Sequence, residues 1–234
     1  MRAIILAAGK GTRLAPVTDE IPKPLVKVNG RRIIETQIEA LLAAGIEDIT
    51  IIRGYLKDKF AVLLEKYPKL KFIDNPYFET ANNISSIVTA GELVRDAYIV
   101  EGDLLIRNPA IIEPKPARTN YLTVPVKEVN DWCFFPDETG KILKMATSGR
   151  DCAQMVGISY WTDADGARLA KHAAELFSKD YGKEKYWDEI ALDEYLEEYD
   201  IYVRSCRREE VLEIDTLQEL QALDDSYLKW GNAK

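Results

Sequence analysis

Residues 1–25 read MRAIILAAGKGTRLAPVTDEIPKPL, and the fold and chemistry expected of the chain both follow from this stretch. The apolar run from Ala3 to Leu6 predicts a buried strand. It stops in the small residues of 7–11, which allow backbone N–H groups to approach a bulky anion closely. Arg13 follows at once, and Lys23 stands between two prolines that bias its segment away from helix. A strand, a glycine turn and two cations together indicate a loop that binds phosphate.

Two common phosphate loops do not fit this stretch. A P-loop would need a glycine where Ile4 stands, and the dinucleotide fingerprint would need one where Leu14 stands. The stretch instead resembles the signature L-A-A-G-x-G-[ST]-R-L-x-P, followed by K-P, of the sugar-nucleotidyltransferase superfamily. Every fixed position is matched, although an ordinary strand and loop with two surface cations is the structural alternative. The resemblance implies a nucleotide site that includes the two catalytic cations and consists of Leu6, Ala7, Ala8, Gly9, Gly11, Thr12, Arg13 and Lys23.

The composition limits the classes of partner. Of 234 residues, 47% are hydrophobic and 30% charged, which is typical of a soluble globular protein. The net charge of −8 argues against nucleic acid as the main partner. No apolar run approaches the roughly 18 residues that a membrane helix needs, and the N-terminal run is too short for a signal peptide. The sparse cysteines, which lack metal-ligand spacing, predict free thiols in a cytoplasmic protein: Cys133, Cys152 and Cys206.

Strand and helix patterns alternate through the first half of the chain. Predicted strands at 24–28, 48–53, 70–73 and 97–100 alternate with predicted helices at 31–44, 57–66 and about 82–95. Repeated β-α-β units predict an α/β fold with a doubly wound, mostly parallel, Rossmann-like sheet. From about Pro109 the pattern becomes a β-rich extension, with strands at 120–126, 132–135, 142–146 and 153–161 and helices at 164–178, 188–198 and 217–228. We expect one domain, 1–234, in which 1–108 binds the nucleotide and 109–234 binds the acceptor.

Two aspartates at the ends of predicted strands are candidate metal ligands. Asp103 follows the strand 97–100 after a glycine, and Asp215 follows the strand 211–214. A turn aspartate and a helix N-cap are the structural alternatives. The superfamily resemblance implies a metal role for both positions, and Mg²⁺ is commonly held by one or two carboxylates plus phosphate oxygens. Because ligands of such sheets gather at the carboxyl ends of the strands, the loop and both aspartates are expected to converge on one site.

Aromatic residues gather in the second half of the chain. Trp132, Trp161 and the run from Tyr186 to Glu189 could cage a quaternary ammonium ion, with roughly 0.5–2 kcal/mol for each face-on contact. Packing in the core is the alternative for each tryptophan. The start of the helix at 186–189 is expected to be exposed, because a Tyr-Trp-Asp-Glu run is unusual as plain core.

Nearly the whole chain resembles the bacterial CTP:phosphocholine cytidylyltransferases. The matching segments are the signature loop, Gly54–Lys57, Asn82-Asn83, Asp103, Asn130–Trp132, Gly157–Trp161, Tyr186–Asp188 and Glu213–Asp215. The resemblance implies transfer of CMP from CTP to phosphocholine, giving CDP-choline and pyrophosphate, with Mg²⁺ as cofactor.

The resemblance also extends the two binding sites. It adds to the nucleotide site the residues Asn82, Asn83, Ser85, Glu101 and Gly102, of which the first three could bond the cytosine or simply cap a helix. The acceptor site would consist of Trp132, Trp161, Tyr186, Trp187, Asp188 and Glu189. The extra carboxylates Glu101 and Glu189 also suit a primary ammonium, so phosphoethanolamine and 2-aminoethylphosphonate are alternative acceptors.

Two further alternatives belong to other functional classes. A hexose-1-phosphate nucleotidyltransferase would carry V-E-K-P, whereas residues 112–116 read IEPKP in the wrong order. A non-catalytic regulatory homologue would not need to retain Arg13, Lys23, Asp103 and Asp215 together. The attacking phosphate oxygen is already ionised and needs no histidine base, and the single histidine, His172, is expected on a solvated helix face. The sequence leaves the oligomeric state open, a homodimer included.

Overall fold

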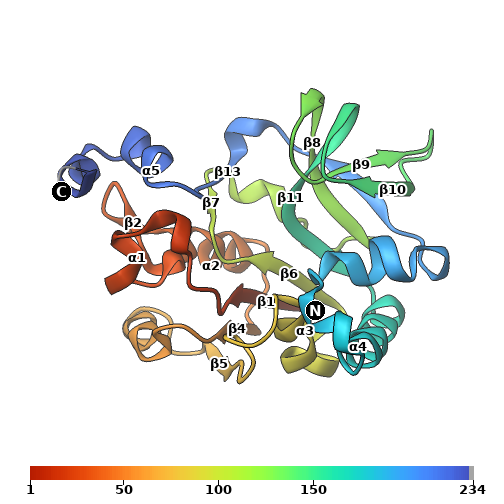
Figure 1. Cartoon of the computed structure of the whole chain (residues 1–234), viewed down its shortest axis with the longest axis horizontal. Helices are drawn as coiled ribbons and strands as arrows, with labels where there is room; N and C mark the ends of the chain where they lie inside the picture. The colour runs from red at the N-terminus through yellow and green to blue at the C-terminus, as the bar shows by residue number, and fades with distance from the viewer. Residues whose placement is uncertain (232–234) are drawn as a thin grey trace.

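The computed structural model describes residues 1–231, and a nine-stranded mixed sheet forms the centre of that part of the chain (Figure 1). The expected domain therefore includes three residues, 232–234, that lie outside the described part. Four neighbouring strands are parallel: β6 (Ala97–Glu101), β1 (Arg2–Ala7), β4 (Ile49–Arg53) and β5 (Lys71–Asp74). The doubly wound, mostly parallel core expected from the β-α-β pattern is confirmed.

The β-rich extension continues the same sheet. Strand β11 (Gly149–Trp161) pairs antiparallel with β6 and also carries β8 (Asn120–Val129) and β9 (Cys133–Pro136). The sheet ends in β10 (Ile142–Ala146) beside β9 and β12 (Tyr202–Ser205) beside β8. Two small antiparallel pairs lie apart from it: β7 (Leu104–Ile106) with β13 (Val211–Glu213), and β2 (Lys27–Val28) with β3 (Arg31–Arg32).

Helices cover both faces of the sheet because side chains of the central strand alternate between two cores. Along β1, Ile5 packs into the core that holds α2 (Ile33–Ala43), whereas Ile4 packs into the core that holds α3 (Ile84–Ala90) and α4 (Asp163–Phe177). Figure 1 shows α3 and α4 together on one side of the sheet and α2 on the other.

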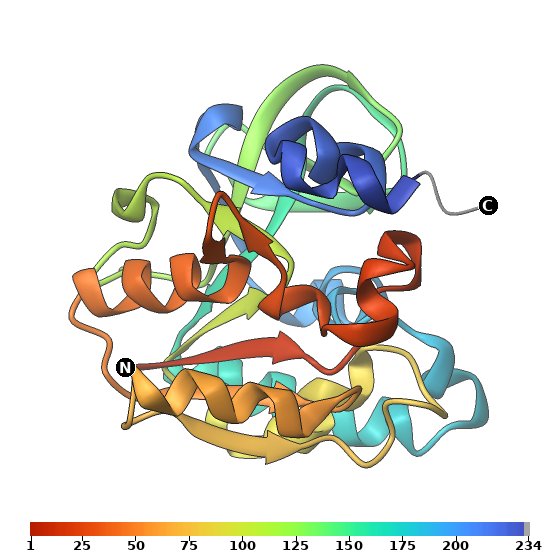
Figure 2. The same ribbon diagram turned by 90° about the vertical axis from the view of Figure 1, so that its left-hand side faces the viewer.

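A third core joins the two ends of the chain. Leu14 and Val17 of the segment after β1 pack with Ile214 and Leu220 near the C-terminus. The elements that carry them are α1 (Val17–Glu20) and α5 (Leu217–Leu223), the latter followed by a 3₁₀ turn at Asp225–Gly231. Figure 2 shows this C-terminal segment, in dark blue, lying over the N-terminal segment in red. The contact brings residues about 200 positions apart to one side of the sheet.

Three local expectations need correction. The strand expected at 24–28 is only Lys27–Val28, because the proline-flanked Lys23–Leu25 forms a 3₁₀ turn. The helix expected at 57–66 is a 3₁₀ helix, Lys57–Glu65. The helix expected at 188–198 contains a π-helical turn, Ile190–Glu194, and a 3₁₀ turn, Leu196–Glu198.

The expectation that His172 is solvated is wrong. Its side chain lies on the buried face of α4, where the ring stacks on Tyr195 and Nδ1 lies 2.9 Å from the Tyr199 hydroxyl. Burial lowers the pKa of this histidine. The three cysteines are buried free thiols. Within residues 1–231, none of the helices combines the length and the apolar character needed to span a bilayer.

Candidate functional site

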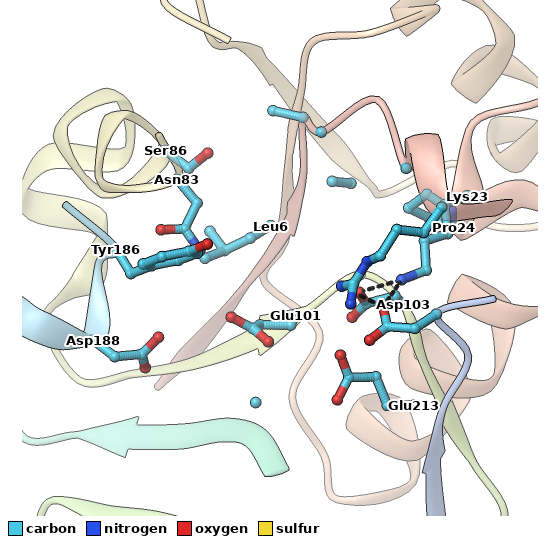
Figure 3. Close-up of a pocket in the computed structure, with 18 of the residues that line it drawn as sticks. Leu6, Lys23, Pro24, Asn83, Ser86, Glu101, Asp103, Tyr186, Asp188 and Glu213 are labelled. Carbon is cyan, nitrogen blue, oxygen red and sulfur yellow. Dashed lines mark hydrogen bonds and ion pairs between the residues drawn. The ribbon is translucent and has the colours of Figure 1, made fainter. Parts of the chain in front are cut away.

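A cavity of about 580 Å³ opens at the carboxyl ends of β1 and β6. One wall is the loop after β1, and the facing walls come from the segment after β13, the bulged middle of β11 and the helix start at 186–188. This is the edge of a parallel sheet at which ligands gather. Figure 3 shows Lys23, Asp103 and Glu213 on one side of this space and Tyr186 and Asp188 on the other, with Glu101 between them.

The loop after β1 presents backbone to the cavity. A Cβ added to Gly9 would meet no atom within 4 Å, so the chain there is open to a ligand. Gly11 has a φ of +62°, and a Cβ there would lie 3.0 Å from Cβ of Lys23. Both the conformation and the close approach therefore require glycine. The hydroxyl of Thr18 donates to the carbonyl of Gly11 at 2.9 Å, which fixes the turn.

Lys23 lies at the centre of the first charge cluster. Its side chain is 9% exposed, and Nζ donates to Asp103 Oδ2 and to Asp215 Oδ1, each at 2.7 Å. Arg13 Nη2 also donates to Asp215 Oδ1, at 2.8 Å, while its own side chain stays largely exposed. Burial alone would lower the pKa of Lys23, but the two carboxylates raise it. The loop cations and both candidate metal ligands thus lie in one place.

Glu213 is a third carboxylate in this cluster. One carboxylate oxygen from each of Asp103, Glu213 and Asp215 can be chosen so that all lie within 4.8 Å of one another. The cleft removes water from around the Glu213 carboxyl, and Asp103 and Asp215 add negative charge beside it. Both effects raise the pKa of Glu213, to about 8. Its side chain is nevertheless open to the cavity, as Figure 3 shows.

This group of carboxylates fits a divalent cation. Oxygen ligands are those that Mg²⁺ prefers, and the buried Asp103 Oδ1 has no hydrogen-bond partner within residues 1–231. An unpartnered buried oxygen is costly unless something else binds it. Asp103, Asp215 and Glu213 are therefore the residues that would hold Mg²⁺.

The other half of the cavity combines aromatic and acidic side chains. Trp132 and Tyr186 meet edge to face with ring centroids 5.8 Å apart. Asp188 is buried and accepts a hydrogen bond of 3.0 Å from the hydroxyl of Tyr121, and burial raises the pKa of Asp188 to about 7. Burial and the charge of Asp188 also raise the pKa of Glu101, whose Oε1 accepts from Nε1 of Trp187 at 3.2 Å.

Three of the six expected acceptor residues do not line the cavity. Trp161 and Trp187 are fully buried in the second core. The expected exposure of the helix start holds for Tyr186 and is wrong for Trp187 and Asp188, which are buried. Glu189 turns back, accepting from the backbone N–H of Tyr186 at 2.6 Å and pairing with Lys185. The lining residues of this group are Trp132, Tyr186 and Asp188.

Of the three residues expected to bond the cytosine, one lines the cavity and two do not. Asn83 lines the cavity and its Oδ1 accepts from the backbone N–H of Trp187 at 2.8 Å. Asn82 bonds the carbonyl of Glu184, and Ser85 is buried against Asn75, so neither lines the cavity. The remaining expected nucleotide residues all line it: Leu6, Ala7, Ala8, Gly9, Gly11, Thr12, Arg13, Lys23, Glu101 and Gly102.

Several lining residues were not expected. They are Pro24, Ser86, Asp131, Met155, Gly157 and Glu213. The two-residue spacing of Glu213 and Asp215 was a usable signal, because alternate residues of a strand point to one face. Gly157 inside the predicted strand 153–161 was a usable signal as well, because an isolated glycine in a strand suggests a bulge.

Three comparisons place this geometry among known proteins. A family model described as nucleotidyl transferase matches residues 2–116. A 2-aminoethylphosphonate cytidylyltransferase of Lancefieldella rimae is 37% identical over 97% of this chain and 93% of its own length. A choline-phosphate cytidylyltransferase of Streptococcus pneumoniae is 32% identical over 96% of this chain and 97% of its own. The solved structure of a CTP:phosphocholine cytidylyltransferase from S. pneumoniae superposes with a TM-score of 0.88, at 30% identity over 96% of this chain and 98% of that one.

Proposed function

Because this chain belongs to the nucleotidyl transferase family, we propose that it transfers CMP from CTP to a small acceptor that carries both a phosphate or phosphonate group and a primary ammonium group. 2-Aminoethylphosphonate is the acceptor we favour. The observation that carries the nucleotidyl-transfer half of the proposal is Lys23, whose Nζ bridges Asp103 and Asp215 beside the open glycine loop. The extensive similarity to two kinds of cytidylyltransferase supports CTP as the donor.

The reaction needs positioning and charge neutralisation more than proton transfer. An ionised oxygen of the acceptor attacks the α-phosphorus of CTP, and the bond from that phosphorus to the β-phosphate oxygen breaks, so pyrophosphate leaves. Backbone N–H groups of 8–11, with Arg13 and Lys23, would bind the triphosphate and stabilise the charge that develops on the leaving group. Mg²⁺ held by Asp103, Asp215 and Glu213 would add positive charge against the phosphate oxygens. The nucleophile is already an anion, so no side chain has to remove a proton.

The acidic character of the acceptor half favours a primary ammonium. Glu101, Asp131 and Asp188 line the cavity close to Tyr186 and Trp132. A primary ammonium has three N–H donors for such carboxylates, and charge-assisted hydrogen bonds of this kind are the strong ones. A trimethylammonium has none.

Phosphocholine is a second candidate because of one observation. The Trp132 and Tyr186 rings meet at the cavity wall, and aromatic faces attract quaternary ammonium ions. The aromatic group at the cavity wall is smaller than the predicted cage, because Trp161 and Trp187 lie in the core.

Release of pyrophosphate, measured with CTP and a panel of acceptors, tests the proposal. The panel is 2-aminoethylphosphonate, phosphoethanolamine, phosphocholine and glucose 1-phosphate, with UTP and ATP as alternative donors. We expect kcat/KM to be at least tenfold higher for a primary-ammonium acceptor than for phosphocholine. A preference for phosphocholine would favour the aromatic cage, a preference for glucose 1-phosphate would overturn the amino acceptor, and no turnover by the folded protein would favour a non-catalytic homologue.

A further inference from the structure

A β-bulge on β11 makes room for one carboxylate of the cavity. The register between β11 and β8 shifts between Met155 and Ser159, and Gly157 lies in this shift with a φ of +36°. A Cβ on Gly157 would stand 2.6 Å from Oε2 of Glu101 and 3.1 Å from its Cδ. Real atoms do not approach so closely, so the Glu101 carboxyl occupies its place only because residue 157 has no side chain. Bulges commonly redirect groups beside active sites.

The backbone of Glu101 cannot move to relieve such a clash. Glu101 is the last residue of β6 and pairs in register with Leu6 of β1. Its carbonyl also accepts from Nε2 of the buried Gln37 at 3.0 Å. Only the side chain is adjustable, and its Oε1 accepts from Nε1 of Trp187 at 3.2 Å. The Trp187 indole therefore holds Oε1 of Glu101, and Oε2 lies in the space that a side chain at residue 157 would fill.

Trp187 also contributes, through Tyr121, to the position of a second carboxylate, Asp188. Trp187 stacks on Tyr121 with ring centroids 5.8 Å apart and an angle of 18° between the planes. The hydroxyl of Tyr121 donates to Asp188 at 3.0 Å. Figure 3 shows Glu101 between Asp188 on one side and the group of Asp103 and Glu213 on the other. Glu101 thus faces the space between the proposed triphosphate site and the proposed ammonium site.

We propose that Glu101 is the residue that selects a primary ammonium over a trimethylammonium, and that Trp187 and Gly157 are positioning residues that hold its carboxyl in the cavity. This inference rests on the proposed function and names the group that makes its choice of acceptor. A carboxylate so confined can accept an N–H of a primary ammonium. Three methyl groups would instead leave its oxygens desolvated and unpaired, and a site built to bond an N–H discriminates strongly against an analogue without one.

The test measures kcat/KM for 2-aminoethylphosphonate and for phosphocholine in matched variants, together with the KM for CTP and the melting temperature. Glu101→Gln keeps the shape and removes the charge, and we expect the ratio of the two kcat/KM values to fall 10- to 100-fold. Trp187→Phe keeps most of the packing and removes the N–H donor, and Gly157→Ala displaces the carboxyl. For both we expect the ratio to fall about tenfold, with the KM for CTP changed less than twofold.

Trp161→Phe is the control for a purely structural effect. Trp161 is as buried as Trp187 and lies in the same core, but its Nε1 donates to the hydroxyl of Ser159, at 2.9 Å, and not to a cavity carboxyl. We expect this variant to lose comparable stability and to keep the wild-type ratio. Equal ratios in Trp187→Phe and Trp161→Phe, or an unchanged ratio in Glu101→Gln, would overturn the inference.

The wild-type data separate the two proposals. Wild-type protein that turns over phosphocholine better than 2-aminoethylphosphonate would overturn this inference and leave cytidylyl transfer standing. Wild-type protein that turns over neither acceptor would overturn both.

Discussion

Lys23, near the N-terminus, links Asp103 from the middle of the chain with Asp215 from near its C-terminus. Its ammonium group is fixed at 2.7 Å from both Asp103 and Asp215. In the proposed reaction, this ammonium group would stabilise the negative charge that develops on the leaving pyrophosphate. Preorganised charge of this kind needs no rearrangement during the reaction. The flanking residues Pro22 and Pro24 restrict the backbone that carries it.

We expect Lys23→Ala to lower kcat about 10²- to 10³-fold, the usual cost of removing one such electrostatic contact. The side chain is 9% exposed and neutralises Asp103 and Asp215, so the melting temperature should also fall, and turnover is compared at a temperature at which the variant is folded. Steady-state kinetics and thermal unfolding measure the two effects. Lys27→Ala, which removes an exposed cation of the same segment, is the control and should keep wild-type turnover. Near-normal turnover by Lys23→Ala would remove the catalytic assignment.

Asp188 is expected to give the proposed reaction a specific dependence on pH. Burial raises the pKa of this carboxyl to about 7, so in the ligand-free cavity it is mostly neutral below that pH and mostly charged above it. The groups that face it are Tyr121, Glu101 and Glu189. Because an ammonium ion binds the charged form, kcat/KM for the acceptor should rise as pH increases through about 7.

The acceptor itself contributes to such a profile, since a phosphoryl group has a second pKa near 6. The comparison is therefore with Asp188→Asn, whose profile should lose the step near 7 and keep the titration of the acceptor and of Glu101 and Glu213, two cavity carboxyls whose pKa values are also raised. Superimposable profiles for the two proteins, after scaling, would show that Asp188 does not bind the ammonium in charged form.

The sequence was informative about charged residues at strand ends and less so about aromatic ones. Asp103 lies at the ligand edge because it follows the parallel strand β6, and that edge is predictable from strand order. Asp215 instead follows β13, which pairs antiparallel with β7 outside the main sheet, so its contact with Lys23 depends on the packing of the C-terminal segment against the N-terminal one. Tryptophan suits a core and a ligand cage equally well, and the run at 186–189 does not reveal which residue faces inward. Trp187 faces the core and Tyr186 the cavity, a choice made by packing against β8 and β11.

Among the elements, the regular helices and strands were predictable and the irregular ones were not. The strands of the extension appear within a few residues of where alternation placed them, with β11 longer than expected at Gly149–Trp161. The π-helical turn at Ile190–Glu194 carries no local signal, and the signal for the bulge is a single glycine, Gly157, inside a predicted strand. Both lie next to residues that line the cavity, and irregular backbone of this kind is common at functional sites.

The start of α5 fixes the backbone of Asp215, a proposed metal ligand. Glu219 accepts hydrogen bonds from the backbone N–H groups of Asp215 and Thr216, each at 2.8 Å, and Thr216 caps the helix in return. The N-cap alternative for this segment thus applies to Thr216, while Asp215 turns toward Lys23. The capping box fixes the backbone from which Asp215 reaches the cavity.

We expect Glu219→Ala to lower the melting temperature by about 2–4 °C, since losing such a cap costs about 1 kcal/mol. The Mg²⁺ concentration needed for half-maximal activity should rise several-fold, because Asp215, the proposed ligand, would be held less firmly. Gln218→Ala, on the exposed side of the same helix, is the control for helix propensity and should change neither value. A loss of stability with an unchanged Mg²⁺ requirement would separate the cap from the metal site.

The whole molecule folds around a site that neither end of the chain can form alone. The cavity is lined by residues from Leu6 to Asp215, and the third core holds the N-terminal loop against the C-terminal segment. A ligand that contacts both the glycine loop and the carboxylates of Asp103 and Asp215 would therefore stabilise the folded chain as a unit. The stabilisation should depend on metal, because the carboxylates would otherwise repel a triphosphate.

Thermal unfolding with CTP and Mg²⁺ tests this coupling. At CTP concentrations 100-fold above Kd, binding adds about 2.7 kcal/mol, which for a chain of this size raises the melting temperature by about 5–10 °C. Chelation of the metal with EDTA should remove most of the shift. Asp103→Asn and Asp215→Asn should lose the metal-dependent part, whereas Asp58→Asn, an exposed aspartate away from the cavity, should keep it. An equal shift with CTP in EDTA would mean that the nucleotide binds without an ion, and the three carboxylates would then need another role.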